Sequence, residues 1–113
     1  MLIGDLKNKH VLIIDDMIDT AGTICNAAEA SINNGALTVT AIATHPVLSG
    51  LSIERLKKSK ISEVIVCNTI NIKKEKLFNK LQVVNVAPVF GEAIKRIIDG
   101  TSLSSMFKDV KGH

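Results

Sequence analysis

The chain has 113 residues, of which 46% are apolar and 22% are charged, and its formal net charge at pH 7 is +3. This length suits one small domain, and this apolar content excludes an intrinsically disordered chain. The lysines are scattered and the only aromatic residues are three Phe, so no dense basic face with stacking aromatics is expected for a nucleic acid.

The first predicted elements are a strand and a helix joined by a polar segment. His10 to Asp16 is a continuous apolar run that ends in two acids, as in strands buried on both faces of a parallel sheet. Thr23 to Asn34 has apolar residues at helical spacing. Thr23 is the expected N-cap of this helix, and Gly35 is the expected residue just beyond its end.

The remainder of the chain continues to alternate between strands and helices. We predict strands over 37–44, 63–67 and within 80–87, and helices over 53–57 and from about Pro88 to Asp99. Pro46 ends the second strand, and Gly100 stops the last helix. Such alternation predicts right-handed crossovers and an α/β fold with three layers and a mainly parallel sheet. Ligands of such sheets bind at the carboxyl ends of the strands, which points to loops 15–23, 44–50 and 67–74.

The loop after the first strand combines acids, threonines and a glycine. Its candidate site residues are Asp15, Asp16, Asp19, Thr20, Ala21, Gly22 and Thr23. A helix N-terminus offers free N–H groups and a favourable dipole to a phosphate, and the threonines add hydroxyl donors. The paired acids would repel a phosphate, but they can accept hydrogen bonds from vicinal sugar hydroxyls or interact with a metal that bridges sugar and pyrophosphate. The loop therefore predicts a ligand with hydroxyls at one end and phosphate at the other, such as a sugar 5-phosphate.

Simpler interpretations compete for several other residues. A single acid at a strand end is usually a helix cap, although the complete string matches an anion site. His45 could act as an acid, base or ligand, but its position before Pro46 favours a tether for the loop. Cys25 and Cys67 lie in apolar stretches without partners at metal spacing. They are therefore expected to be buried free thiols, and no metal site is assigned.

Val11 to Thr23 resembles the phosphoribosyl-pyrophosphate binding motif, in the Asp-Met-Ile-Asp-Thr form that is similar to the ribose-phosphate pyrophosphokinases. The resemblance continues over 43–50, 67–70, 93–97 and 102–107. It implies a type I phosphoribosyltransferase-like fold. Residues 1–113 would form a single domain that matches the C-terminal half of these enzymes, with the N-terminal domain absent. The chain would then be a fragment that carries the ribose-5-phosphate binding loop.

The resemblance also implies roles for particular residues. Asp15 and Asp16 would contact the ribose hydroxyls, and residues 19–23 would wrap the 5-phosphate. Ala21 departs from the Gly often found in the family. Ser102, Ser104, Ser105 and Phe107 match part of an allosteric site for phosphate or ADP, but a frayed polar tail explains these serines equally well.

Members of this family transfer a diphosphoryl group from ATP to ribose 5-phosphate, with Mg²⁺, as cytoplasmic homo-oligomers. The resemblance implies ribose 5-phosphate and ATP as partners here, with no nucleic acid and no membrane. In the family, the upstream half supplies most ATP contacts, the metal ligands and the catalytic Lys and Arg. No catalytic residue is therefore assigned in this chain, and the fragment alone is expected to be inactive.

Three other functions remain open at this point. A nucleobase phosphoribosyltransferase uses the same loop, although no aromatic base-recognition element is visible. A non-catalytic regulatory or remnant subunit would suit a chain without the upstream half. A receiver-like signalling domain also has paired acids after its first strand, but it needs an Asp at the end of the third strand, where this chain has Cys67 and Asn68.

Overall fold

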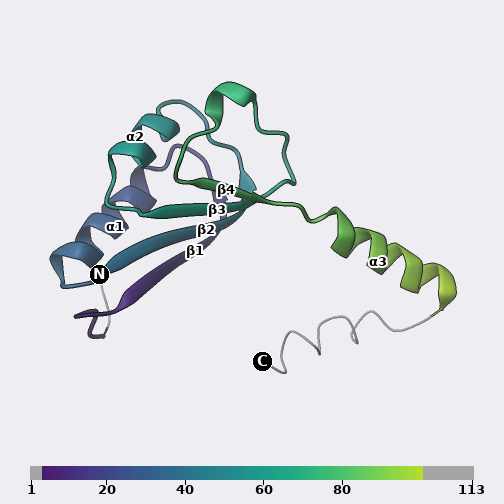
Figure 1. Ribbon diagram of the computed structural model, residues 1–113, viewed down its shortest axis with the longest axis horizontal. Helices are drawn as coiled ribbons and strands as arrows, with labels where there is room; N and C mark the ends of the chain where they lie inside the picture. Colours follow the sequence, from purple (N-terminus) through teal and green to yellow (C-terminus); the bar gives the residue numbers. More distant parts are fainter. Residues whose placement is uncertain (1–3, 101–113) are drawn as a thin grey trace.

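The computed structural model describes residues 4–100 of the chain. It contains four strands, β1 His10–Ile18, β2 Thr38–Pro46, β3 Glu63–Cys67 and β4 Leu81–Val84. Helix α1, Gly22–Asn33, and helix α2, Ser52–Lys58, connect the first three strands. A 3-10 turn, η1 Lys74–Lys76, lies between β3 and β4, and helix α3, Ala87–Asp99, follows β4 (Figure 1).

The four strands are parallel and lie in the sequential order β1-β2-β3-β4. Right-handed crossovers between strands added in one direction place their helices on the same face of a sheet. Helices α1 and α2 accordingly lie together on one face (Figure 1). The predicted parallel α/β class is therefore confirmed.

The core lies between the sheet and these two helices. Ile13, Ala41, Val64 and Leu81 form one row across all four strands on this face. Ile24 and Ala28 of α1 and Leu56 of α2 pack against this face and are buried. Burial of such side chains stabilises the domain by roughly 1.5–3 kcal/mol for each large aliphatic group.

The opposite face of the sheet is not covered by any element within residues 4–100. Ile14, Ile42 and Ile65 form a row across three strands there. On edge strand β1 this face is open, since Leu12 is 59% exposed and Ile14 is 73% exposed. The third layer of the predicted architecture is thus not completed by the described part of the chain.

Helix α3 extends away from the sheet rather than over it (Figure 1). Asn68 and Asn85 set this direction. The Asn68 side chain accepts the N–H of Val86 at 2.8 Å and donates to the Asn85 side chain at 2.9 Å. Asn85 in turn accepts the N–H of Ala87 at 3.0 Å, in the first turn of α3. The helix therefore leaves the sheet with Ile94, Ile97 and Ile98 exposed.

Several predicted boundaries differ from the observed ones. Strand β1 continues two residues beyond Asp16, to Ile18, so both acids lie inside the strand. Gly35 follows α1 with φ of +95°, as predicted, and a Cβ there would lie 3.2 Å from the Lys7 backbone. Both cysteines are free, as expected, but each is only half-buried.

Among the described residues, no helix has both the length and the apolar character that a bilayer crossing requires.

Candidate functional site

A small hollow lies where β1 passes into α1. Its volume is about 160 Å³, and its lining includes Asp15, Asp19, Thr20, Ala21, Gly22 and Thr23. Sequence reasoning did not include the apolar side of this hollow, formed by Met17, Ile18 and Ile24. The structure thus brings together six of the seven predicted loop residues at one end of the sheet.

The two adjacent acids lie on different sides of β1. Asp15 lies in the same row as Ala43 and Val66, which belong to the helix-covered face, and it lines the hollow. Side chains alternate along a strand, and Asp16 is not among the lining residues. Both carboxylates are exposed, but only Asp15 faces the residues of the following loop.

The start of α1 differs from the predicted cap. Ala21, not Thr23, occupies the N-cap position, and Ala21 adopts a left-handed conformation with φ of +68°. An L-residue in this conformation is strained by roughly 1–2 kcal/mol. Thr23 lies one residue inside the helix, with its side chain exposed beside the hollow.

The first turn of α1 leaves backbone donors available for an external acceptor. The first hydrogen bond of the helix runs from the N–H of Cys25 to the Ala21 carbonyl at 3.1 Å. Among the described residues, no side chain caps the helix start, and the first turn contains no acid. The preceding N–H groups, from Gly22 to Ile24, therefore point their partial positive charge toward solvent at the hollow. This arrangement favours an anion.

Two residues from α2 and the turn before it hold the loop in shape. The Ser49 hydroxyl donates to the Asp19 carboxylate, and the Ser49 N–H donates to the Asp19 carbonyl at 3.0 Å. Arg55 Nη1 donates to the Thr20 carbonyl at 2.9 Å. Sequence reasoning missed both contacts, because they join residues 30 and 35 positions apart.

The electrostatics of Asp15 favour its ionised form. A hydrogen bond with the Asp16 side chain is the largest cause, followed by the Asp16 backbone N–H, which lies 2.7 Å from Asp15 Oδ1. These interactions hold the pKa of Asp15 below its ordinary value. Asp15 is therefore a carboxylate at neutral pH and can accept hydrogen bonds from a ligand.

His45 has the tethering contact that its position predicted. Its Nδ1 atom lies 2.8 Å from the Thr69 hydroxyl, and that hydroxyl donates to the Thr44 carbonyl at 3.1 Å. A hydroxyl that donates its one proton to a carbonyl can only accept from the ring, so Nδ1 carries the ring proton. The contact joins the carboxyl end of β2 to the loop that follows β3.

Within residues 4–100, no three His, Cys, Asp or Glu side chains converge on a point that could hold a metal ion. Asp15 and Asp16 provide two adjacent carboxylates. Since only Asp15 of this pair faces the hollow, Asp15 is the one of the two that could hold Mg²⁺ there, because Mg²⁺ commonly keeps several waters and takes one or two protein carboxylates beside ligand phosphates. The predicted allosteric residues Ser102, Ser104, Ser105 and Phe107 lie outside the described residues.

Comparison with known proteins gives a consistent result. The model of the phosphoribosyl synthetase-associated domain family matches residues 1–108. A ribose-phosphate pyrophosphokinase of Caldanaerobacter subterraneus is 52% identical over 106 residues, which cover 94% of this chain and 34% of that protein. The Clostridium acetobutylicum protein of the same name is 50% identical over 108 residues, 96% of this chain and 34% of that protein.

A solved structure also matches the fold. The crystal structure of phosphoribosylpyrophosphate synthetase from Mycobacterium smegmatis superposes with a TM-score of 0.83 at 40% sequence identity. The match covers 87% of this chain and 33% of the other. The chain therefore spans about one third of the length of the relatives that it matches.

Proposed function

The chain belongs to the phosphoribosyl synthetase-associated domain family, and on this basis we propose that it is the ribose-5-phosphate-binding part of a ribose-phosphate pyrophosphokinase. One observation carries the proposal. The free N–H groups at the start of α1 adjoin a hollow that also contains the Asp15 carboxylate. A ligand that suits both ends must present an anion at one end and hydrogen-bond donors at the other.

The phosphate end of the ligand would lie against residues 19–23. Backbone N–H groups and the Thr20 and Thr23 hydroxyls would donate to the phosphate oxygens, and the dipole of α1 would add attraction. The Ser49 hydroxyl donates to the Asp19 carboxylate, and this hydrogen bond offsets part of the negative charge that Asp19 brings to the hollow. Because Ser49 and Arg55 hold this loop without ligand, little ordering free energy remains to be supplied on binding.

The ribose end of the ligand would lie against the acids of β1. Asp15 would accept hydrogen bonds from ribose hydroxyls inside the hollow, and Asp16 would contact them from the outer side of the strand. With both ends fixed, the 1-hydroxyl would be held in one orientation for transfer. Such positioning can supply roughly 7–11 kcal/mol of barrier lowering when both reactants are oriented.

The remaining parts of the proposal concern the complete enzyme. This chain would be the C-terminal half, residues 1–113 forming one domain, and the N-terminal domain of the complete enzyme would bind ATP. Mg²⁺ bound with ATP would neutralise charge on the transferred diphosphoryl group. The complete protein would be a cytoplasmic homo-oligomer, with Ser102, Ser104, Ser105 and Phe107 at a regulatory phosphate or ADP site. Without the ATP-binding half, the chain would bind the sugar phosphate but not turn it over.

Calorimetric titration of the chain with ribose 5-phosphate tests the proposal. Thr23→Val should weaken binding by roughly 1–3 kcal/mol, the effect of losing a hydrogen bond to a charged group. Thr40→Val is the matched control, because Thr40 lies within β2, away from the hollow. Equal affinity in the two variants, or no binding to the folded wild-type chain, would contradict the proposal.

A further inference from the structure

A second cleft lies behind the phosphate loop, between α1 and α2. It is larger than the hollow described above, with a volume of about 530 Å³. One stripe of α1 lines it, formed by Gly22, Cys25, Asn26 and Glu29, at helical spacing. These residues are small or polar, so the two helices are not closed together by large apolar side chains on this side.

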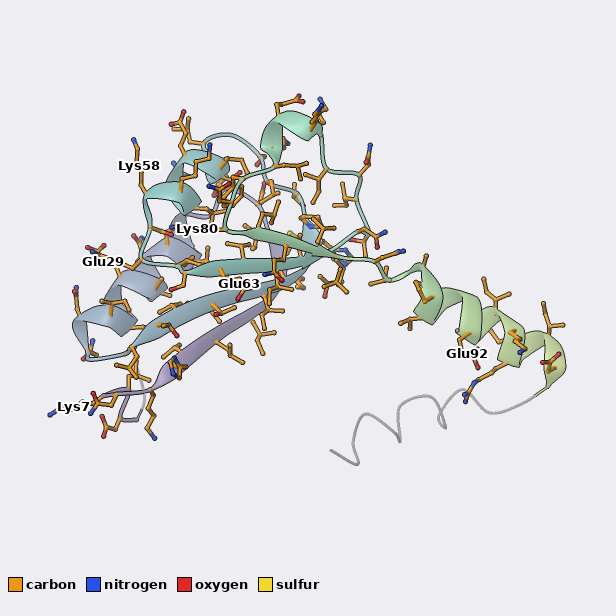
Figure 2. All side chains as sticks on the ribbon, in the orientation of Figure 1. Lys7, Glu29, Lys58, Glu63, Lys80 and Glu92 are labelled. Atoms are coloured by element: carbon orange, nitrogen blue, oxygen red, sulfur yellow. The ribbon has the colours of Figure 1, made fainter. Side chains whose placement is uncertain are left out.

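The opposite wall of the cleft is cationic. Arg55, Lys58 and Lys60 line it, against one carboxylate, Glu29. Glu29 and Lys58 extend from α1 and α2 on the same side of the molecule (Figure 2). Neither Lys58 nor Lys60 forms an ion pair or an ammonium hydrogen bond with any residue between 4 and 100. The cleft thus has an excess of positive charge that the described protein does not neutralise.

Two groups near the cleft that could repel an anion are either already hydrogen-bonded to a cation or uncharged. The carbonyl end of α2 carries partial negative charge, but the Lys80 ammonium donates to the carbonyls of Leu56, Lys57 and Ser59 at 3.1, 3.1 and 3.2 Å. Burial raises the pKa of the Cys25 thiol, so this side chain is neutral at physiological pH. Asn26 and the thiol can therefore act as neutral donors beside the cations.

We propose that the cleft between α1 and α2 binds a phosphorylated small molecule with at least two negative charges, at a site separate from the phosphate loop. Arg55, Lys58 and Lys60 contact its anionic groups, while Asn26 and Cys25 lie against its remainder. The cleft shares Gly22 with the hollow on the other side of the loop. Arg55 lines the cleft and also donates to the Thr20 carbonyl, so the ligand lies directly against a residue that supports the loop.

Inorganic pyrophosphate is the probe that tests this proposal, in a titration of the ¹⁵N-labelled chain followed by NMR. The amide resonances of Cys25, Asn26 and residues 58–60 should shift together. The affinity of pyrophosphate obtained from these shifts is fitted separately from the affinity obtained from residues 19–23. The double variant Lys58→Gln and Lys60→Gln should weaken binding at the cleft at least tenfold. The matched double variant, Lys9→Gln with Lys95→Gln, removes the same charge from exposed positions outside the cleft. It should change the affinity for pyrophosphate at the cleft less than twofold.

A second measurement uses the two thiols and needs no variant. Pyrophosphate should slow the alkylation of Cys25 at least threefold without slowing that of Cys67, because only Cys25 lines the cleft. Shifts confined to residues 19–23 would overturn the proposal, as would equal weakening in the two double variants. Equal protection of both thiols would also overturn it.

Discussion

Arg55 Nη1 lies 2.9 Å from the carbonyl oxygen of Thr20, so a residue of α2 directly supports the turn that precedes α1. The hydrogen bond is charge-assisted. This hydrogen bond fixes the orientation of the Thr20 carbonyl. Because the peptide unit is planar, it also fixes the N–H of Ala21. The shape of the phosphate loop therefore depends on a helix that begins thirty residues later in the chain.

Replacing Arg55 with Gln should weaken the binding of ribose 5-phosphate by about 1 kcal/mol, or about fivefold, since the contact is exposed. The midpoint of thermal unfolding should change little, because no buried group is lost. Calorimetry and thermal unfolding of the same samples measure both quantities. Arg96→Gln on α3 is the control for loss of one positive charge, and an equal effect of the two variants would contradict a role for the Thr20 contact.

Ala21→Gly should destabilise the domain less than Ala28→Gly. Both changes remove a buried methyl group, but Ala21 has φ of +68° whereas Ala28 lies within α1. Glycine relieves the strain at the first position and lowers helix propensity at the second, so the two free energies of unfolding should differ by at least about 1 kcal/mol. Urea denaturation measures the difference, and equal destabilisation would show that Ala21 is unstrained.

Asp15 should contribute stability that depends on pH. Its pKa in the folded chain is lower than the ordinary value of 3.8. The contribution of Asp15 to the free energy of unfolding is therefore present when the pH is above about this ordinary pKa. It is lost as the pH falls through the lower pKa of the folded chain. Urea midpoints of wild type and Asp15→Asn should differ above pH 4 and converge in more acidic solution. Midpoints that differ by the same amount at every pH would contradict the lowered pKa.

The open face of the sheet should make the chain associate with itself. Leu12 and Ile14 are exposed side by side on β1, and such apolar patches commonly mark contact surfaces. Leu12→Thr with Ile14→Thr should reduce association in sedimentation velocity, because both side chains lie at the uncovered face. Leu37→Thr with Leu51→Thr is the control for exposed apolar residues outside the strands. A monodisperse wild-type monomer at high concentration would refute the expectation.

Local patterns predicted most of the sheet, because they depend on neighbouring residues. Glu63 to Cys67 has apolar residues in an unbroken run between polar segments, and β3 has these bounds. The sequence also predicted the loop residues that line the hollow. The prediction that Thr23 caps α1 was wrong, because the left-handed turn at Ala21 starts the helix before Thr23. Neither the Ser49 and Arg55 contacts nor the direction of α3 could be predicted, since each depends on residues far apart in sequence.

The sequential order of the strands has a consequence for the path of folding. Each of β2, β3 and β4 pairs with the strand before it in the chain, so each pairing closes a shorter loop than a sheet with distant neighbours would require. During synthesis, β1, α1 and β2 can associate first, as soon as they are available. The phosphate loop reaches its final shape only after Ser49 and Arg55 have been added. We therefore expect nascent chains that end before α2 to protect the amides of β1 from hydrogen exchange while loop 19–22 still exchanges freely.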